Sequence, residues 1–488
     1  MLNTLNTMLT NSNVTIVGVN FDEDPREISL SIAQEMGIAF PTLSMEVVSD
    51  LGLAAPNVLP TTYILSPDNE VVAKMIGEQT RESLLDQLQS LGLVSEANEA
   101  RLELLPSPAA INSSLSRVVT DGKGQVYLSW VTREGEMASL RYAKLEGDDW
   151  TTPVTISQGN DWFNNWADFP SLLVNDDSMT AHWLRMSADG TFDYDIEAAF
   201  YNSESDAWST GITIHKDGVS AEHGFVSMLA MSEGRTFITW LDGRETVVNN
   251  DDGAGLDTEA NEYGAMTLRA GVFDKNGATV SAWELDHRVC DCCQTSSAMS
   301  NTGPMVVYRD RSDDEIRDIY ITRFEDDAWT EPVAIHNDGW QIAGCPVNGP
   351  SIAAQGEQVA VSWFTARDDS PKVKLVLSDD NGKTFSAPIL VANETTNGRV
   401  GTAILESGHV AVSWMDTKAT DAKIMLTLYS AQGQLLETTQ VATSKASRRS
   451  GFPIIVSAGN DVYVSWTDIS DGAQVRVARL SYAYLIRD

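Results

Sequence analysis

Short runs of alternating apolar and polar residues fill most of this chain, a pattern typical of β-strands that bury one face. One run recurs with little change: Ala360-Val361-Ser362-Trp363 returns at residues 411–414 and again at 463–466. Looser copies end in an aromatic residue at four upstream positions: Trp130, Trp183, Trp240 and Tyr308. From about residue 105 onward, the chain is therefore organised as a repeat.

A strand-rich repeat of roughly 50 residues predicts a β-propeller. Each copy would form one four-stranded blade, and a blade buries its faces only against its neighbours. Counting the copies gives seven blades, whereas merged repeats would give six. The last repeat ends after its third strand, residues 475–480. Residues 102–105 would supply the missing outer strand and close the ring.

The first 93 residues follow a different pattern, in which strands alternate with helices. Strands are predicted at 14–21, 59–65 and 70–76, and helices at 25–37, 45–53 and 80–91. The sequence therefore predicts a multidomain chain: an α/β domain over residues 1–93, an acidic linker over 94–104 and an all-β propeller over 105–488.

The N-terminal stretches VTIVGVNFDED, FPTL and LPTTYILSPDNEVV resemble the later two-thirds of a thioredoxin-like domain of the TlpA/AhpC type. The resemblance implies that Pro60 is the cis-proline that faces the redox centre in that family. The family's Cys-x-x-Cys helix would precede Met1, and no cysteine lies before Cys290. We therefore expect an N-terminally truncated domain that, as written, carries out no dithiol chemistry.

The turn Ser378-Asp379-Asp380-Asn381-Gly382-Lys383-Thr384-Phe385 matches the Asp-box pattern Ser-x-Asp-x-Gly-x-Thr-Trp, with Phe in place of Trp. This turn resembles those of the sialidase/BNR-repeat propeller superfamily, and the resemblance covers most of residues 110–488. The Asp box is structural in that family, so the match bears on the fold and not on catalysis.

If the chain were a sialidase-like enzyme, the resemblance would require an arginine triad, a Tyr–Glu nucleophile pair and an aspartic acid. Arg244, Arg309 and Arg311 are the candidates for the triad, and Asp168 for the acid. The sequence offers no Arg-Ile-Pro motif before the first blade and no evident Tyr–Glu pair. Arginines near the channel mouth suit a carboxylated or sulfated ligand, or an internal ring of salt bridges between blades.

All four cysteines fall before the first strands of two consecutive blades. Cys290, Cys292 and Cys293 precede blade four, and Cys345 precedes blade five. Equivalent positions on adjacent blades predict that the four meet at the channel mouth. Two histidines are candidate neighbours: His287 and His223.

Three interpretations of the cysteines are open. They form structural disulfides, as in many extracytoplasmic proteins; they form a thiolate site for Cu(I) or Zn(II); or they form a redox-active dithiol. A thioredoxin-like partner in the same chain favours the third interpretation, because an intact domain of that kind reduces cysteines.

The composition of the chain limits the classes of partner that it can bind. A net charge of −36 argues against nucleic acid, whose phosphates such a surface repels. No apolar run approaches the length of a membrane span, and the chain opens without a recognisable signal peptide. The acidity suits a periplasmic or secreted protein. Dense carboxylates at residues 248–259 suggest either a Ca²⁺ site or a solvated acidic loop.

The leading hypothesis is an extracytoplasmic binding or redox-linked propeller with a cysteine cluster at its mouth. Its ligand would be a small molecule, a glycan or a protein. The alternative is a glycoside hydrolase that acts on acidic sugars, and a third hypothesis is a protein–protein scaffold with structural disulfides.

Overall fold

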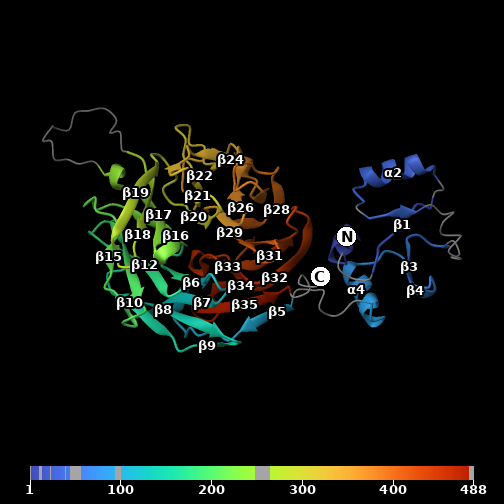
Figure 1. Cartoon of the computed structure of the whole chain (residues 1–488), viewed down its shortest axis with the longest axis horizontal. Coiled ribbons are helices and arrows are strands. Elements are labelled where there is room, and N and C mark those ends of the chain that lie inside the picture. The colour runs from blue at the N-terminus through green and yellow to red at the C-terminus, as the bar shows by residue number, and fades with distance from the viewer. Residues whose placement is uncertain are drawn as a thin grey trace. The chain divides into compact units, whose positions relative to one another are not determined.

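The computed structural model describes residues 2–9, 14–21, 24–38, 40–43, 56–93, 101–247 and 264–482. The chain divides into two compact units (Figure 1). One comprises Met1–Ala100, Gln434–Glu437 and Tyr482–Asp488, and the other comprises Arg101–Gly433 and Thr438–Ser481.

The N-terminal unit is α/β. Its described elements are α1 (Leu2–Met8), β1 (Gly18–Val19), α2 (Arg26–Glu35), β2 (Thr42–Leu43), β3 (Thr61–Leu65), β4 (Val71–Ile76) and α4 (Arg81–Ser90). β1 pairs with β2 in parallel, and β3 pairs with β4 as an antiparallel hairpin. The core consists of apolar side chains from α1, β3 and α4: Leu5, Leu9, Ile64, Leu84, Leu85 and Leu88.

The predicted order of elements in this unit is largely confirmed. The hairpin and the helices expected at 25–37 and 80–91 are present, and the Leu59–Pro60 peptide bond is cis. The strand expected at 14–21 is shorter than predicted and has ladder pairing only at β1. The helix expected at 45–53 lies outside the described residues.

The larger unit consists of seven antiparallel sheets, so the seven-blade prediction is confirmed. Blade one contains β6 (Ser113–Thr120), β7 (Val126–Glu134), β8 (Met137–Glu146), β9 (Asp149–Trp150) and β10 (Val154–Gly159). Blade two contains β11 (Ser171–Asn175), β12 (Ser178–Met186), β13 (Tyr194–Asn202), β14 (Ala207–Trp208) and β15 (Ile212–Thr213). Blade three contains β16 (His223–Ala230), β17 (Thr236–Asp242), β18 (Thr267–Phe273) and β19 (Thr279–Asp286).

The remaining four blades follow in chain order. Blade four contains β20 (Ser296–Met299), β21 (Pro304–Arg309), β22 (Ile319–Glu325), β23 (Ala328–Trp329) and β24 (Val333–His336). Blade five contains β25 (Ser351–Gln355), β26 (Gln358–Thr365), β27 (Lys372–Ser378) and β28 (Ile389–Asn393). Blade six contains β29 (Thr396–Ile404), β30 (Val410–Lys418), β31 (Asp421–Tyr429) and β32 (Leu435–Lys445). Blade seven contains β33 (Ile454–Ala458), β34 (Asp461–Asp468) and β35 (Gln474–Ser481), together with β5 (Arg101–Leu105).

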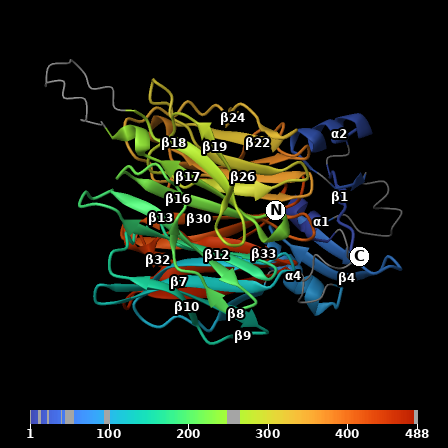
Figure 2. The same cartoon turned by 60° about the vertical axis from the view of Figure 1, so that its left-hand side comes forward.

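The first strands of the blades form the inner ring. Each contacts the first strand of the blade before it and of the blade after it, and β33 of blade seven contacts β6 of blade one. Figures 1 and 2 show the sheets following one another in chain order, from cyan through green and yellow to red. The ring closes where β5 pairs with β35, with Leu105 opposite Val477 and Arg101 opposite Ser481. The predicted closing strand is therefore present.

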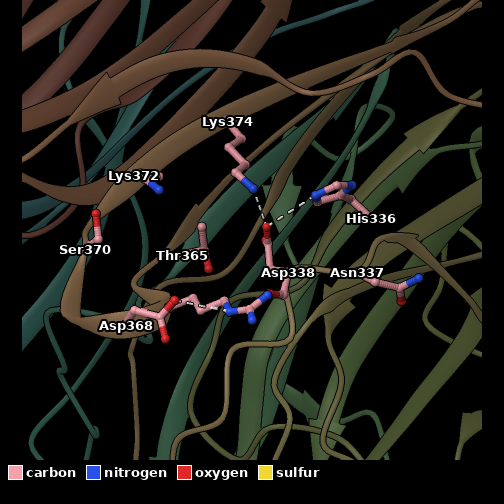
Figure 3. Close-up of a pocket in the computed structure, with 9 residues that line it drawn as sticks. His336, Asn337, Asp338, Thr365, Asp368, Ser370, Lys372 and Lys374 are labelled. Carbon is pink, nitrogen blue, oxygen red and sulfur yellow. Dashed lines mark hydrogen bonds and ion pairs between the residues drawn. The ribbon is translucent and has the colours of Figure 1, made fainter.

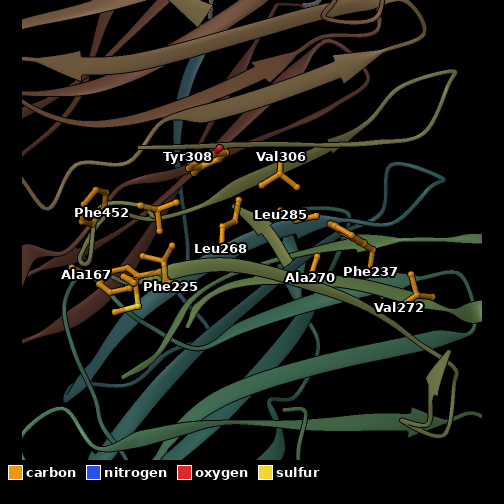
Figure 4. Close-up of a cluster of buried hydrophobic side chains, with 13 residues drawn as sticks. Ala167, Phe225, Phe237, Leu268, Ala270, Val272, Leu285, Val306, Tyr308 and Phe452 are labelled. Carbon is orange, nitrogen blue, oxygen red and sulfur yellow. The ribbon is translucent and has the colours of Figure 1, made fainter. Parts of the chain in front are cut away.

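The repeated aromatic residue lies in the core of every blade. All seven are at most 5 % exposed: Trp130, Trp183, Trp240, Tyr308, Trp363, Trp414 and Trp466. The alternation in the sequence explains their burial, because residues two apart on a strand share one face of the sheet. Figure 4 shows one cluster of buried side chains, in which Phe225 and Phe237 of blade three meet Val306 and Tyr308 of blade four.

The turn after β27 has the local hydrogen bonds expected from its sequence. Asp380 Oδ1 accepts from the backbone N–H groups of Lys383 and Thr384, and Gly382 has φ +74°. Phe385 packs against the apolar cluster between blades four and five.

Candidate functional site

The loop between β19 and β20 carries three cysteines, and backbone hydrogen bonds fix it to two blades. Val289 N donates to Met266 O at 2.9 Å, and Cys290 N donates to Arg309 O at 3.0 Å. The three sulfurs lie within 4.8 Å of one another, and the Cys290 and Cys293 sulfurs are 3.3 Å apart. Cys290 and Cys293 are 1 % exposed, Cys292 is half-buried, and all are free thiols.

Cys345 joins this group from the loop before β25. It is exposed, and it shares a hydrogen bond with Cys292. The two loops pack tightly, because Gln294 Oε1 accepts from Gly349 N at 3.0 Å. A Cβ atom at Gly349 would lie 2.0 Å from Gln294 O, so only glycine fits there. The residues that follow each cysteine stretch therefore hold the two loops together.

The cysteine environment is electropositive on one side. Arg317, which is 3 % exposed, donates from Nη1 to Cys290 Sγ at 3.1 Å. Hydrogen bonds from Cys292 and Cys293 hold the pKa of Cys290 well below its usual range, and the charge of Arg309 acts in the same direction. Burial raises the pKa of Cys293 to about 12. The surroundings therefore favour the thiolate form of Cys290 over those of its neighbours.

The three arginines proposed for a carboxylate-binding triad all have protein partners. Arg309 is 2 % exposed and donates to backbone carbonyls. Arg311 binds Glu315 and Asp291, and Arg244 binds Asp242. Arg244 and Arg311 therefore form internal ion pairs, whereas the described hydrogen bonds of Arg309 go to backbone carbonyls and not to a carboxylate.

Asp168 lies at the centre of a buried group that the sequence did not reveal. Its Oδ2 accepts from Tyr194 OH at 2.9 Å, its Oδ1 accepts from Phe225 N at 2.8 Å, and Tyr194 OH also lies 3.0 Å from Glu222 Oε1. Glu222 comes directly before the first strand of blade three, as the cysteines do in blade four. That position was the signal that could have placed Glu222 at the channel mouth.

One proton must be shared within this group. Tyr194 has a single O–H hydrogen, so with both carboxylates ionised one of its two contacts would be repulsive. Burial raises the pKa of Asp168 to about 7 and that of Glu222 to about 8. The charges of Asp291 and Cys345 also raise the pKa of Glu222. The carboxyl group and the cysteine cluster therefore influence each other electrostatically.

This shared proton gives a testable pH dependence. Because the folded-state pKa of Asp168 is raised, its contribution to stability is complete below about pH 4 and is lost as pH rises through about 7. The variant Asp168→Asn mimics the protonated acid. Between pH 4 and pH 8, we expect its free energy of unfolding to rise relative to that of the wild type by on the order of 4 kcal/mol. Urea unfolding at several pH values measures the difference. Asp177→Asn, at an exposed position of the same blade, should show no such trend, and parallel curves for all three proteins would contradict the shared proton.

The two histidines proposed as neighbours of the cysteines contact other groups. His287 is exposed, and its Nδ1 is 3.8 Å from Asp286 Oδ1. His223 is fully buried and stacks on His215, with 3.8 Å between ring centroids. The described contacts of both histidines are with groups other than the cysteines. The acidic stretch 248–259 and residues 94–100 of the expected linker lie outside the described residues, whereas Arg101–Leu105 is strand β5.

A polar cavity of about 290 Å³ lies beside blade five (Figure 3). Several basic side chains line it, including Arg367, Lys372 and Lys374. Lys374 pairs with Asp338, which also accepts from Trp363 Nε1 at 2.6 Å. The cavity therefore contains a partly buried ion pair as well as basic groups.

Comparison with known proteins finds one short sequence match and several solved structures with a similar arrangement of strands. No family model matches. The thiol-disulfide oxidoreductase ResA of Bacillus cereus is 31 % identical over 74 residues, which cover 15 % of this chain and 43 % of that protein. The chain thus spans less than half of the length of this relative. None of the described helices is long and apolar enough to cross a membrane.

Solved structures with a similar arrangement share little sequence. A Dyadobacter fermentans protein of unknown function has 12 % identity, covers 78 % of this chain and 98 % of its own, and gives a TM-score of 0.42. The K499G mutant of the NanB sialidase from Streptococcus pneumoniae has 11 % identity. The match covers 80 % of this chain and 70 % of that one, with a TM-score of 0.36. Similarity at this level assigns no family. The chain is a seven-bladed β-propeller with a weak thioredoxin-like similarity at its N-terminus.

Proposed function

We propose that the propeller is an extracytoplasmic module that binds a soft metal ion, Cu(I) or Zn(II), through Cys290, Cys292 and Cys293. The observation that carries the proposal is the convergence of three sulfurs from one loop within 4.8 Å. Zn–S bonds of about 2.3 Å in a tetrahedron place the sulfurs about 3.8 Å apart. The spacing in this loop is close to that value, so a small movement of the side chains would allow coordination.

The surroundings suit a negatively charged thiolate centre. Three thiolates with Cu(I) carry a net charge of −2, and the nearby guanidinium groups of Arg309 and Arg317 offset it. The N–H of Arg317 that faces Cys290 would also orient the sulfur by donating a hydrogen bond to it. Cys345 is exposed and adjacent to Cys292, so it would act as an exchangeable fourth ligand. An exchangeable ligand suits binding and release of the metal rather than a permanent structural site.

A second candidate function is thiol–disulfide exchange, favoured by the 3.3 Å contact between Cys290 and Cys293. Both cysteines are 1 % exposed, so the loop would first open; the Cys290 thiolate would then attack a partner's disulfide and form a mixed disulfide, releasing one partner thiolate. Cys293 would pass its proton to that thiolate and displace the second partner sulfur. The products are a Cys290–Cys293 disulfide and a partner dithiol, so two electrons pass to the partner. The N-terminal similarity to a thiol-disulfide oxidoreductase adds support for this chemistry.

The glycoside-hydrolase hypothesis has weaker support. Tyr194 and Asp168 are 0 % and 2 % exposed, so neither is accessible to a sugar in this conformation. The candidate triad Arg244, Arg309 and Arg311 is engaged with protein groups.

Elemental analysis with a parallel thiol count tests the proposal, on protein purified both anaerobically and in air. We expect about one Cu or Zn per chain in the anaerobic protein, and we expect Cys292→Ser/Cys293→Ser to lose it. His287→Gln is the matched control, because it alters an exposed side chain of the same loop and should retain the metal.

Two outcomes would decide against a metal. If the chain contains no metal after incubation with Cu(I) or Zn(II), and all four thiols react freely, the metal site is wrong. If air removes two thiols and a dithiol reductant restores them, with no metal bound at any stage, thiol–disulfide exchange is the function.

A further inference from the structure

A second group of metal-type ligands lies between blades two and three, apart from the cysteines. It contains two stacked histidines, His215 and His223, and three carboxylates that flank them: Asp195, Asp217 and Asp242. We propose that His223, Asp217 and Asp242 form a binding site for a divalent metal ion with nitrogen and oxygen ligands. This proposal does not depend on the function of the cysteine cluster.

The fold fixes the position of the three ligands. His223 begins β16 and lies opposite Asp242 at the end of β17, where the two residues are register partners. Asp217 comes from the loop after β15, and its Oδ1 accepts from Val219 N at 2.9 Å. The ligands therefore lie on strand ends and a hydrogen-bonded turn, which hold them in place before any ion binds.

The hydrogen bonds of His223 leave one ring nitrogen facing negative charge. Its Nδ1 lies 3.2 Å from Ala221 O and donates to it, so a neutral His223 would present a lone pair at Nε2. Nε2 is fully buried without a hydrogen-bond partner. It faces Asp217 Oδ2 at 3.5 Å and Asp242 Oδ1 at 3.6 Å. A buried lone pair opposite two carboxylates is repulsive unless a cation lies between them.

The spacing of these atoms favours an ion over a direct hydrogen bond. Contacts of 3.5 and 3.6 Å are longer than a typical N–H···O hydrogen bond of about 2.9 Å. Bonds of about 2.1 Å from a tetrahedral ion would place its ligand atoms about 3.4 Å apart. All three ligand atoms lie within 4.8 Å of one another. The two distances from His223 Nε2 are therefore close to those between the ligand atoms of a tetrahedral ion.

The neighbouring groups orient these ligands as in known metal sites. His215 Nδ1 donates to Asp217 Oδ2 at 2.7 Å, and Trp240 Nε1 donates to Asp242 Oδ2 at 2.8 Å. Arg244 binds the Asp242 carboxylate through Nε and Nη2. Such outer contacts fix the rotamers of ligating carboxylates.

The charge balance leaves room for a cation. The three carboxylates around the histidine pair carry −3, Arg244 contacts two of them, and Arg269 Nε lies 4.0 Å from Asp242 Oδ2, so the described groups keep a net negative charge. A divalent ion would offset the remaining charge. Imidazole with carboxylates suits Zn²⁺, and three protein ligands leave a fourth position open for water or an anionic ligand.

Cobalt spectroscopy separates this site from the cysteines. We would add Co²⁺ to a variant in which all four cysteines are serine, and compare it with the same variant carrying His223→Gln or Asp217→Asn. We expect one Co²⁺ per chain with ligand-field bands and no thiolate charge-transfer band, displaced by Zn²⁺ and weakened at least tenfold by either substitution. His287→Gln is the matched control and should bind normally.

The intact chain provides a second measurement in case the cysteine-free variant does not fold. In the intact chain, Co²⁺ bound to the cysteines is recognised by its thiolate charge-transfer band. His223→Gln should remove only the bound Co²⁺ that lacks this band. Binding that is absent, or that both substitutions leave unchanged, would overturn the proposal. Protonation of both His223 nitrogens in Zn²⁺-saturated protein, measured by ¹⁵N NMR, would also overturn it and would identify the cation as a proton.

Discussion

Replacing Leu105 by aspartate is expected to lower the free energy of unfolding of the propeller by about 4 kcal/mol. Leu105 is 6 % exposed in β5, where it packs in a cluster that includes Trp130 of blade one and Val477 of blade seven. The substitution removes these apolar contacts and places a carboxylate among them. It acts where the ring closes, so the whole propeller should unfold at lower urea concentration.

The adjacent residue of the same strand provides the control. Leu104 is 66 % exposed because neighbouring strand residues point to opposite faces. Leu104→Asp should change stability by less than about 0.5 kcal/mol. Urea unfolding followed by tryptophan fluorescence compares the two variants. Equal effects of both substitutions would mean that β5 does not contribute its apolar face to the closure of the ring.

Arg309→Met is expected to destabilise the chain by about 3–5 kcal/mol, because three buried carbonyls each lose a charged donor. The guanidinium of Arg309 donates to the backbone carbonyls of Asn348, Arg317 and Phe364, and it stacks over Trp340. It thereby links blades four and five next to the cysteine loops. Methionine fills a similar volume but leaves these buried carbonyls without a donor.

Arg133→Met is the matched control, because Arg133 lies near the same end of blade one and is exposed. Its loss should leave stability nearly unchanged. If Arg309→Met is as stable as the wild type but loses affinity for a carboxylated ligand, Arg309 is a ligand-binding residue and the structural role described above is wrong. Thermal unfolding and ligand titration of the same two variants distinguish these results.

The blade architecture was predictable because its cause is local. Alternating apolar residues and a buried aromatic near the end of the second strand mark each blade, and residues 102–105 have the same alternation. The order of the strands and helices around Pro60 was likewise predictable from the local pattern of apolar residues. The strand expected at 14–21 was too long, because a run of apolar residues indicates strand propensity and does not specify where a partner strand ends.

The pairing of the buried polar groups was not predictable, because packing between blades brings these residues together. Tyr194 and Glu222 are 28 positions apart, and His215 and His223 come from a loop and a strand end of different blades. No spacing rule links such residues. The arginines looked like ligand-binding groups for a related reason: the sequence shows their position near the mouth but not the backbone carbonyls that bind them.

The closing strand has a consequence for synthesis on the ribosome. β5 is synthesised before the blades, and Glu103 can pair with Arg479 only after 376 further residues have been added. At about 5–20 residues per second, this wait lasts roughly 20 to 75 s. During that interval the exposed edges of the incomplete ring are open to pairing with other nascent chains. Dependence on chaperones in vivo should therefore be concentrated in the period before the last blade emerges.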